Sequence, residues 1–280
     1  MTYYLFTDLD RTLIPNGAHI QDKQSIKILT ALHDSDKLKL IYVSGRDKNL
    51  IQSAIKEHGL PIPDLAIADV GARIYQIIDN KWENDQEWNM YLSTNWDDEK
   101  FRALGNELSQ IAILREQEPE KQSRFKHSYY LAADDLDSAI DKTIHDISES
   151  LGLKIRIIKS LDETSNTGLL DILPGSASKY HAIRFLMDKY QFELENMVFS
   201  GDSGNDMEVL TSELPSILVK NAHHSVQRQA KELSKINSHE QQLYIADGDF
   251  FGLNGHYCSG ILEGLAYYLP VFRKWIAELT

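Results

Sequence analysis

The sequence has almost no cysteine, few basic residues relative to its acidic ones, and no long apolar segment. Cys258 is the only cysteine in 280 residues, so no disulfide can form within the chain and we expect a reducing compartment. Its 29 basic residues are outnumbered by 42 acidic ones, which gives a formal net charge of −13. A broadly negative protein is unsuited to general nucleic-acid binding, because phosphate-backbone contacts require basic surface.

No apolar run approaches the ~20 residues that a membrane-spanning helix needs. A signal peptide has a basic region followed by a long apolar one, and the N-terminal segment has no such pattern. We therefore expect a cytoplasmic protein without membrane association. We also expect a monomer, because no sustained heptad pattern is present. Cys258 begins the apolar periodic stretch GHYCSGILEGLAYYL, which favours a buried packing residue over a reactive thiol.

The chain does contain an alternation of short apolar runs and amphipathic segments, both before residue 81 and after residue 170. Apolar strands that do not alternate with polar residues, and that are separated by helices, predict a parallel sheet covered on both faces. The fold class is therefore α/β, with a Rossmann-like parallel-sheet core. The expected strands are YYLFT, LKLIYVSG, LAIADVG, ARIYQIID, MVFSG, SILVKNA and LYIA, and the expected helices are SIKILTALHDSD, DKNLIQSAIKEHG, SKYHAIRFLMDKY, NDMEVL, HSVQRQAKELSK and CSGILEGLAYYL.

The middle of the chain, from about Trp82 to Thr167, is more polar. It contains two long helical patterns, each followed by a strand candidate: WDDEKFRALGNELSQI with HSYYLAA, and LDSAIDKTIHDISESLG with LKIRIIKSL. We interpret residues 82–169 as an inserted α+β cap domain, and residues 1–81 and 170–280 as the core domain. The alternative is that this region is simply more of one domain. The segment SLDETSNTG is expected to be an exposed loop.

Two carboxylates end the first expected strand, in YYLFTDLDRTLIP. Residues at i and i+2 of a strand point to the same face, so Asp8 and Asp10 would project together. Two negative charges at such a short distance repel each other, so a nearby positive charge must offset the repulsion.

Three further polar signals lie at the ends of expected elements. In parallel α/β sheets, ligands bind beyond the carboxyl ends of the strands, so these groups could form one site. An acidic, oxygen-only cluster suits a hard cation such as Mg²⁺, and Ser44, Lys179 and helix-start N–H groups suit a phosphate. The signals are YVSGR with Ser44, Gly45 and Arg46, SASKYHAI with Lys179, and FSGDSGNDMEVL with Asp202, Asn205 and Asp206.

Each of these residues also has an ordinary structural interpretation. Asp202 and Asp206 could cap a helix, and Lys179 could be a solvated surface lysine. Arg46 could equally pair with a surface acid, so we do not count it among the catalytic residues. The association of these residues with Asp8 and Asp10 favours a functional site.

Together, DLDRT, YVSGR, Lys179 and GDSGND resemble the four ordered motifs of the haloacid-dehalogenase (HAD) superfamily of aspartate-dependent phosphohydrolases. The inserted segment between the second and third motifs is similar to the large α+β cap of one subgroup, and Arg11 replaces the glycine most common in the first motif. The resemblance implies that Asp8 is the nucleophile that forms an aspartyl-phosphate. It also implies that Asp10 protonates the leaving sugar oxygen and later activates water.

The same resemblance implies further roles around a Mg²⁺ ion. Asp8, the backbone carbonyl of Asp10, and Asp202 would hold the metal. Thr12 would orient the loop, and Asp206 and Asn205 would be outer or supporting ligands. The residues expected to bind the phosphoryl group are Ser44, Gly45 and Lys179.

Longer segments resemble the sucrose-phosphate phosphatases along nearly the whole chain: AIADVGARIYQ, SRFKHSYYL, GLLDILPGSASK, FSGDSGNDMEVL and VKNA. That family includes phosphatases of mannosylfructose and glucosylglycerol phosphates. The resemblance implies hydrolysis of sucrose 6-phosphate. It also implies that cap residues bind the sugar, for which Lys126 and His127 are the first candidates and Asn254 and His256 are further ones. The alternative for Lys126 is an exposed lysine on an edge strand.

Two other functions stay open at this point. A phosphosugar mutase with this type of cap would share the four motifs. A catalytically silent sugar-binding module is the other alternative, and the presence of Asp8, Asp10, Lys179 and Asp202 counts against it.

Overall fold

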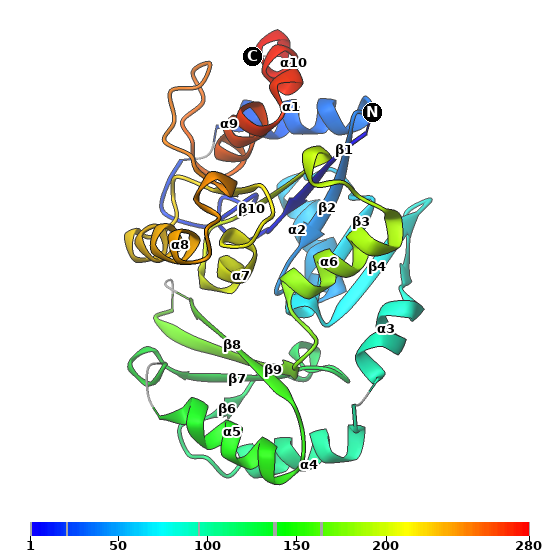
Figure 1. Ribbon diagram of the computed structural model, residues 1–280, viewed down its shortest axis with the longest axis vertical. Helices are drawn as coiled ribbons and strands as arrows, with labels where there is room; N and C mark the ends of the chain where they lie inside the picture. The colour runs from blue at the N-terminus through cyan, green and yellow to red at the C-terminus, as the bar shows by residue number, and fades with distance from the viewer. Residues whose placement is uncertain (1, 21, 95, 137–138, 163–164, 280) are drawn as a thin grey trace.

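Two β-sheets organise the chain. The computed structural model describes residues 2–20, 22–94, 96–136, 139–162 and 165–279 (Figure 1). Within them, the larger sheet has the strand order β12-β11-β10-β1-β2-β3-β4-β5. All pairs from β12 to β3 are parallel, whereas β4 and β5 pair antiparallel at one edge. Its strands are β1 (Tyr3–Thr7), β2 (Leu38–Val43), β3 (Leu65–Ala68), β4 (Arg73–Ile78), β5 (Lys81–Asn84), β10 (Met197–Gly201), β11 (Ser216–Leu218) and β12 (Leu243–Ile245).

Helices cover both faces of this sheet, as the unalternating apolar strands predict. Successive side chains of a strand point to opposite faces, so Leu5 and Phe6 of β1 belong to different apolar clusters. Leu5 packs with helices α1 (Lys23–Asp34), α2 (Lys48–His58), α9 (Cys258–Tyr268) and α10 (Pro270–Leu279). Phe6 packs with α3 (Gln86–Ser93), α6 (Lys179–Tyr190), α7 (Met207–Leu210) and α8 (His224–Ile236). The α/β class is confirmed.

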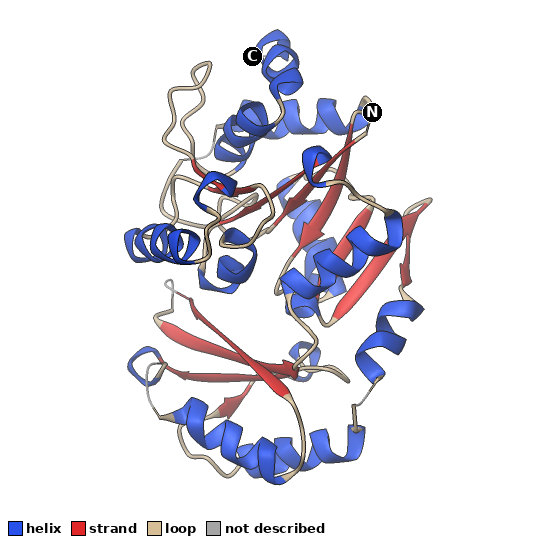
Figure 2. Cartoon of the chain, in the orientation of Figure 1, coloured by secondary structure: helices blue, strands red, loops and turns tan. Residues whose placement is uncertain are grey.

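The smaller sheet is antiparallel, with the order β6-β7-β9-β8. Its helices, α4 and α5, lie on the side of this sheet away from the core (Figures 1 and 2). The helices share an apolar cluster with β7 and β9, so the other face of the small sheet is turned toward the core. These elements are β6 (Arg115–Glu116), β7 (His127–Ala132), β8 (Ile155–Asp162), β9 (Thr167–Pro174), α4 (Asp98–Leu108) and α5 (Ile140–Ser150).

The limits of the second unit differ from the expected 82 and 169. Strand β5 extends the large sheet, and α3 buries Trp88 and Leu92 in the core cluster. At the other end, β9 pairs with both β7 and β8 and reaches Pro174. The sequence pattern predicts none of β5, α3 and β9, and it places the limits of the cap at residues 82 and 169. We therefore propose residues 98–174 as the cap.

Two expected segments fall partly outside the described residues. The helix LDSAIDKTIHDISESLG includes 137–138, and its described part contains α5. The loop SLDETSNTG includes 163–164. Ser160–Asp162 of that segment belong to β8, so this part is a strand and not a loop.

Cys258 is buried at the start of α9, which confirms the packing interpretation. Burial raises the pKa of its thiol to about 12, so the reactive thiolate is disfavoured. Among the described helices, none has the length and apolar character needed to cross a bilayer.

Candidate active site

The first, second and fourth motifs meet at one edge of the large sheet. Strand β1 lies between β10 and β2, and Thr7 aligns with Ser200 on one side and Tyr42 on the other. Asp8, which follows Thr7, donates its N–H to the carbonyl of Ser200 at 2.9 Å. Asp8 and Asp202 thus leave neighbouring parallel strands at the same edge, with Ser44 following β2 beside them.

Lys179 ties the third motif to this edge. It is the first residue of α6, and its side chain is only 1% exposed. Its Nζ donates to Asp8 Oδ1 at 2.9 Å, Asn205 Oδ1 at 3.0 Å and Asp206 Oδ1 at 2.7 Å. The interpretation of Lys179 as a solvated surface lysine is therefore wrong.

Asp206 has two functions at once. Its Oδ2 accepts the N–H groups of Asp202 and Ser203, each at 3.2 Å, which closes a capping box. Its Oδ1 accepts from Lys179. A Cβ at residue 201 would lie 2.6 Å from the Asp206 carboxyl carbon, so only glycine allows this approach. The capping interpretation of Asp206 is correct, but it does not exclude a role in the site.

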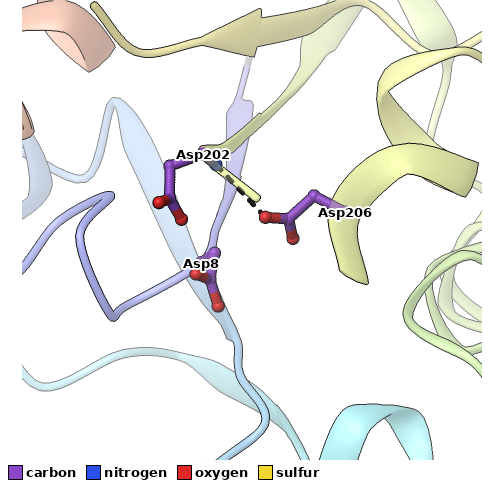
Figure 3. A group of neighbouring side chains, drawn as sticks. All are labelled: Asp8, Asp202 and Asp206. Carbon is purple, nitrogen blue, oxygen red and sulfur yellow. Dashed lines mark hydrogen bonds between the residues drawn. The ribbon is translucent and has the colours of Figure 1, made fainter. Parts of the chain in front are cut away.

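Asp202 is held from the first motif. Thr12 Oγ1 donates to Asp202 Oδ1 at 3.1 Å, and Arg11 Nε lies 3.5 Å from Asp202 Oδ2. One carboxylate oxygen from each of Asp8, Asp202 and Asp206 lies within 4.8 Å of the other two (Figure 3). We call these three acids together with Lys179 the Lys179 cluster.

The electrostatics of the Lys179 cluster are dominated by burial. Burial raises the pKa of Asp8 to about 7, against the lowering effect of the Lys179 ammonium and with further raising by Asp206 and Asp10. Burial, with the charges of Asp8 and Asp206, raises the pKa of Asp202 well above its ordinary value. Three buried acids face one buried ammonium, so additional positive charge would stabilise the ionised carboxylates of the cluster.

Asp10 lies in a different environment. Arg46 binds it in bidentate fashion, with Nε to Oδ2 at 2.7 Å and Nη2 to Oδ1 at 2.6 Å, and Asn16 donates to Oδ1 at 2.7 Å. Burial favours the neutral acid, but these hydrogen bonds hold the pKa of Asp10 below its ordinary value. Arg46, which the sequence analysis left out of the catalytic set, therefore contacts a motif residue and not a remote surface acid.

The loop between Asp8 and Thr12 is supported by a residue that sequence reasoning missed. Arg11 has a φ of 58°, a left-handed conformation in which glycine is unstrained. Asn221 Nδ2 donates to the Arg11 carbonyl at 2.6 Å, and Asn221 Oδ1 accepts the Tyr257 N–H at 2.8 Å. The only signal in the sequence was the segment VKNA, to which no role was attached.

Ser44 and Gly45 follow β2. Ser44 is fully buried, and its Oγ accepts the Arg46 N–H at 3.1 Å. Gly45 is half-buried, and a Cβ at this position would lie 3.7 Å from Val70. Both residues are at the same sheet edge as Asp8, where we expect the phosphoryl group.

The two cap candidates lie on opposite sides of the cap. Lys126 points toward the core, where Nζ lies 2.9 Å from Asp69 Oδ1 and both side chains are 3% exposed. The interpretation of Lys126 as an exposed edge lysine is therefore wrong. His127 faces the cap interior, where Nε2 donates to the Phe101 carbonyl at 3.0 Å. The His127 and Phe101 rings are tilted against each other, with their centroids 4.1 Å apart. His127 is thus turned away from the core, and we withdraw it as a sugar-binding candidate.

The two further candidates lie on the core. Asn254 donates to the carbonyl of Ile20 at 3.0 Å. The ring of His256 stacks on His19 at 4.3 Å. These contacts connect the loop before α9 to the segment before α1 and include none of the Lys179 cluster.

Known proteins with similar sequences and structures include several sugar-phosphate phosphatases. The family described as sucrose-6F-phosphate phosphohydrolase matches residues 1–269. A HAD-like hydrolase of Nitrosococcus oceani is 47% identical over 274 residues, which cover 97% of this chain and 73% of the relative. Sucrose-phosphatase 2 of Nicotiana tabacum is 29% identical over 231 residues, covering 79% of this chain and 51% of the relative. The chain thus spans about half the length of that plant relative.

A mannosylfructose-phosphate phosphatase of Agrobacterium fabrum is 28% identical over 265 residues, covering 94% of this chain and 96% of the relative. Among solved structures, the sucrose-phosphatase of Synechocystis in complex with sucrose and phosphate superposes with a TM-score of 0.75 at 23% identity, covering 96% of this chain and 98% of that one. The structural likeness supports the fold, and the sequence match supports the family. The chain belongs to the sucrose-6F-phosphate phosphohydrolase family and is a phosphoric monoester hydrolase.

Proposed function

We propose that this chain is a Mg²⁺-dependent phosphatase that hydrolyses sucrose 6-phosphate to sucrose and phosphate. The observation that carries the proposal is the Lys179 cluster at the carboxyl end of β1 and β10. A nucleophilic carboxylate, a buried ammonium and nearby oxygen ligands suit phosphoryl transfer, because positioning and charge stabilisation supply most of its catalysis.

The reaction would take place in two displacements. Asp8 attacks phosphorus, the bond to the sugar oxygen breaks, and Asp10 gives that oxygen a proton. A water molecule then attacks phosphorus, Asp10 takes its proton, and the bond to Asp8 breaks to release phosphate. Ser44, Lys179 and the main chain at Gly45 would hold the phosphoryl oxygens during both steps.

Asp10 must change partners during this cycle. Both of its carboxylate oxygens accept from Arg46 in the structure. We expect this pairing to keep Asp10 ionised in the resting enzyme and to loosen when the sugar phosphate binds, so that Asp10 takes up a proton from solvent before it protonates the leaving sugar oxygen. Arg46 would then be a positioning residue for the acid and base steps.

The donor set fits Mg²⁺, which prefers carboxylate and carbonyl oxygens. Asp8, Asp202 and the main-chain carbonyl of Asp10 would hold the ion, which when bound offsets the negative charge of the carboxylates and the phosphate. Both Asp206 oxygens already accept hydrogen bonds, Oδ1 from Lys179 and Oδ2 from the main chain. We therefore assign Asp206 and Asn205 a supporting role.

The choice of sugar depends on the family and on the cap. The family description and the tobacco relative favour sucrose 6-phosphate. Mannosylfructose phosphate is a second candidate, because the Agrobacterium relative aligns over nearly the full length of both chains. Lys126 could contribute to sugar binding only while sharing its ammonium with Asp69.

The experiment measures phosphate release, with Mg²⁺, from sucrose 6-phosphate, mannosylfructose phosphate, glucosylglycerol phosphate, glucose 6-phosphate and fructose 6-phosphate. Turnover of sucrose 6-phosphate that far exceeds the others, and that EDTA or Asp8→Asn abolishes, is the expected result. Faster turnover of another compound would replace the substrate but keep the mechanism. Release of no phosphate, with an isomerised sugar phosphate as product, would overturn the proposal in favour of a mutase.

A further inference from the structure

A buried ion pair joins the cap to the core outside the Lys179 cluster. Lys126 lies in the turn before β7, closed by the bridge between Ser123 and Lys126. Its partner Asp69 follows β3 of the large sheet. The pair is 2.9 Å long, with both side chains 3% exposed. We call Asp69 and Lys126 the docking pair, because it can form only when the cap rests on the core.

Asp69 opens a short turn, residues 69–71, that touches both phosphate-binding motifs. The Asp69 N–H donates to the Arg46 carbonyl at 3.0 Å, and the Val70 N–H donates to the Ser44 carbonyl at 3.1 Å. On the other side, a Cβ at Gly71 would lie 2.3 Å from the main chain of Ser178. The turn is therefore packed between the residue before Lys179 and the loop that carries Ser44.

The backbone of this turn is strained. Asp69, Val70 and Gly71 have φ values of 52°, 58° and 100°. A β-branched residue such as Val70 rarely adopts a left-handed conformation, and such strain persists only where the surroundings hold it in place. Those surroundings include the main-chain contacts to Arg46 and Ser44, the close approach to Ser178 and the docking pair. They also include a hydrogen bond from Trp88 Nε1 to the Gly71 carbonyl at 3.1 Å. A change in any one of them should shift the turn as a unit.

We propose that Asp69 and Lys126 are positioning residues, which couple docking of the cap to the placement of Ser44 and Lys179 around the phosphoryl group. When the pair forms, Lys126 holds the 69–71 turn against both motifs. When the cap lifts, the Asp69 carboxylate keeps its ion pair with Arg73, whose Nε lies 3.4 Å from Oδ2. The inference rests on the proposed phosphatase function, but not on the identity of the sugar.

A second ion pair across the same interface offers a matched control. Arg156 of β8 lies 3.1 Å from Glu208 of α7, and the two side chains are 29% and 35% exposed. This pair also joins the cap to the core, but neither residue contacts the 69–71 turn in the described hydrogen bonds. Arg156→Gln therefore removes an interface ion pair without acting on the turn.

The test measures binding of orthovanadate, with Mg²⁺, to the full chain by calorimetry, and hydrolysis of p-nitrophenyl phosphate. Neither probe contains a sugar. Lys126→Met and Asp69→Asn should each weaken orthovanadate binding about tenfold and lower kcat by a similar factor, with the double variant no worse than either single one. Arg156→Gln should stay within twofold of the wild type.

Three results would each overturn the coupling. The first is orthovanadate affinity within twofold of the wild type in both single variants. The others are effects that multiply in the double variant, and a loss in Arg156→Gln equal to that in the single variants. A lower melting temperature with unchanged orthovanadate affinity would also overturn it, because that is the result of a purely structural role. Failure of the proposed phosphatase function has a separate signature, which is wild-type protein that binds orthovanadate but hydrolyses no phosphate ester.

Discussion

The Lys179 cluster and the docking pair use the same chemistry for different ends. Each places a buried lysine ammonium within 3 Å of a buried aspartate. Lys179, however, faces several acids contributed by the core, whereas Lys126 reaches one acid across an interface, with Arg73 on the far side of that acid. The first arrangement concentrates negative charge that a cation and a phosphate can use. In the second, Asp171 of the small sheet also acts on Lys126, so acids on both sides of the interface match the charge of this lysine.

This difference can be tested first at the nucleophile. Asp8→Asn removes the attacking carboxylate, so we expect hydrolysis to fall by on the order of 10⁴-fold or more. The same change removes one of several repelling buried acids, so the melting temperature should be unchanged or higher. Phosphate release and thermal unfolding measure the two effects. A variant that retains a tenth of the activity would contradict the assignment of Asp8, and Asp98→Asn in an exposed cap pair is the control.

Removing the two lysines compares the clusters directly. Lys179→Met leaves Asp8 and Asp206 buried without their ammonium, and we expect a loss of about 3–5 kcal/mol in the free energy of unfolding. Lys126→Met leaves Asp69 with Arg73, so we expect a smaller loss of about 1–3 kcal/mol. Denaturant unfolding of both variants without Mg²⁺ measures the order. Equal losses would mean that Arg73 gives Asp69 no compensation.

Only the Lys179 cluster should respond to Mg²⁺. Binding to the folded state at 100 times the dissociation constant adds about 2.7 kcal/mol of stability, which should raise the melting temperature by several degrees. Asp202→Asn removes a proposed ligand and should abolish the rise, whereas Lys126→Met should keep it. Thermal unfolding with Mg²⁺ and with EDTA measures the shift. A full rise in Asp202→Asn would remove Asp202 from the metal site.

The sequence predicts the first cluster better than the second for a physical reason. Asp8, Ser44 and Asp202 each directly follow an apolar strand, and parallel strands bring their carboxyl ends to one edge. Asp69 also follows a strand, but its role depends on Lys126, whose direction is set by how the cap packs on the core. Likewise, Arg46 could be assigned to Asp10 only once the side chains were placed.

Cap limits were predicted poorly for a related reason. Strand β9 lies between β7 and β8, yet in the sequence GLLDILP runs on from a polar segment and into the third motif without a break. Helix α3 is only 8 residues long, and the burial of Trp88 and Leu92 is what shows that it belongs to the core. In both cases the assignment depends on the partner of the segment, which the local pattern does not contain.

The smallest expected effect concerns His127, which directly follows Lys126 but points into the cap and not toward the core. Burial lowers the pKa of His127, although the Phe101 carbonyl opposes the shift. The unfolded chain therefore takes up this proton before the folded protein does. The contribution of His127 to stability is complete above about pH 6.5 and is lost as the pH falls toward the folded pKa.

His127→Gln keeps an N–H donor for Phe101 but cannot titrate, so its free energy of unfolding should fall less steeply below about pH 6.5 than that of the wild type. His145→Gln on the exposed side of α5 is the control and should follow the wild-type curve. Denaturant unfolding between pH 5 and 8 measures the slopes. Parallel curves for wild type and His127→Gln would mean that this imidazole is solvated. The inward side of the cap would then resemble its surface, and the contrast between Lys126 and His127 would disappear.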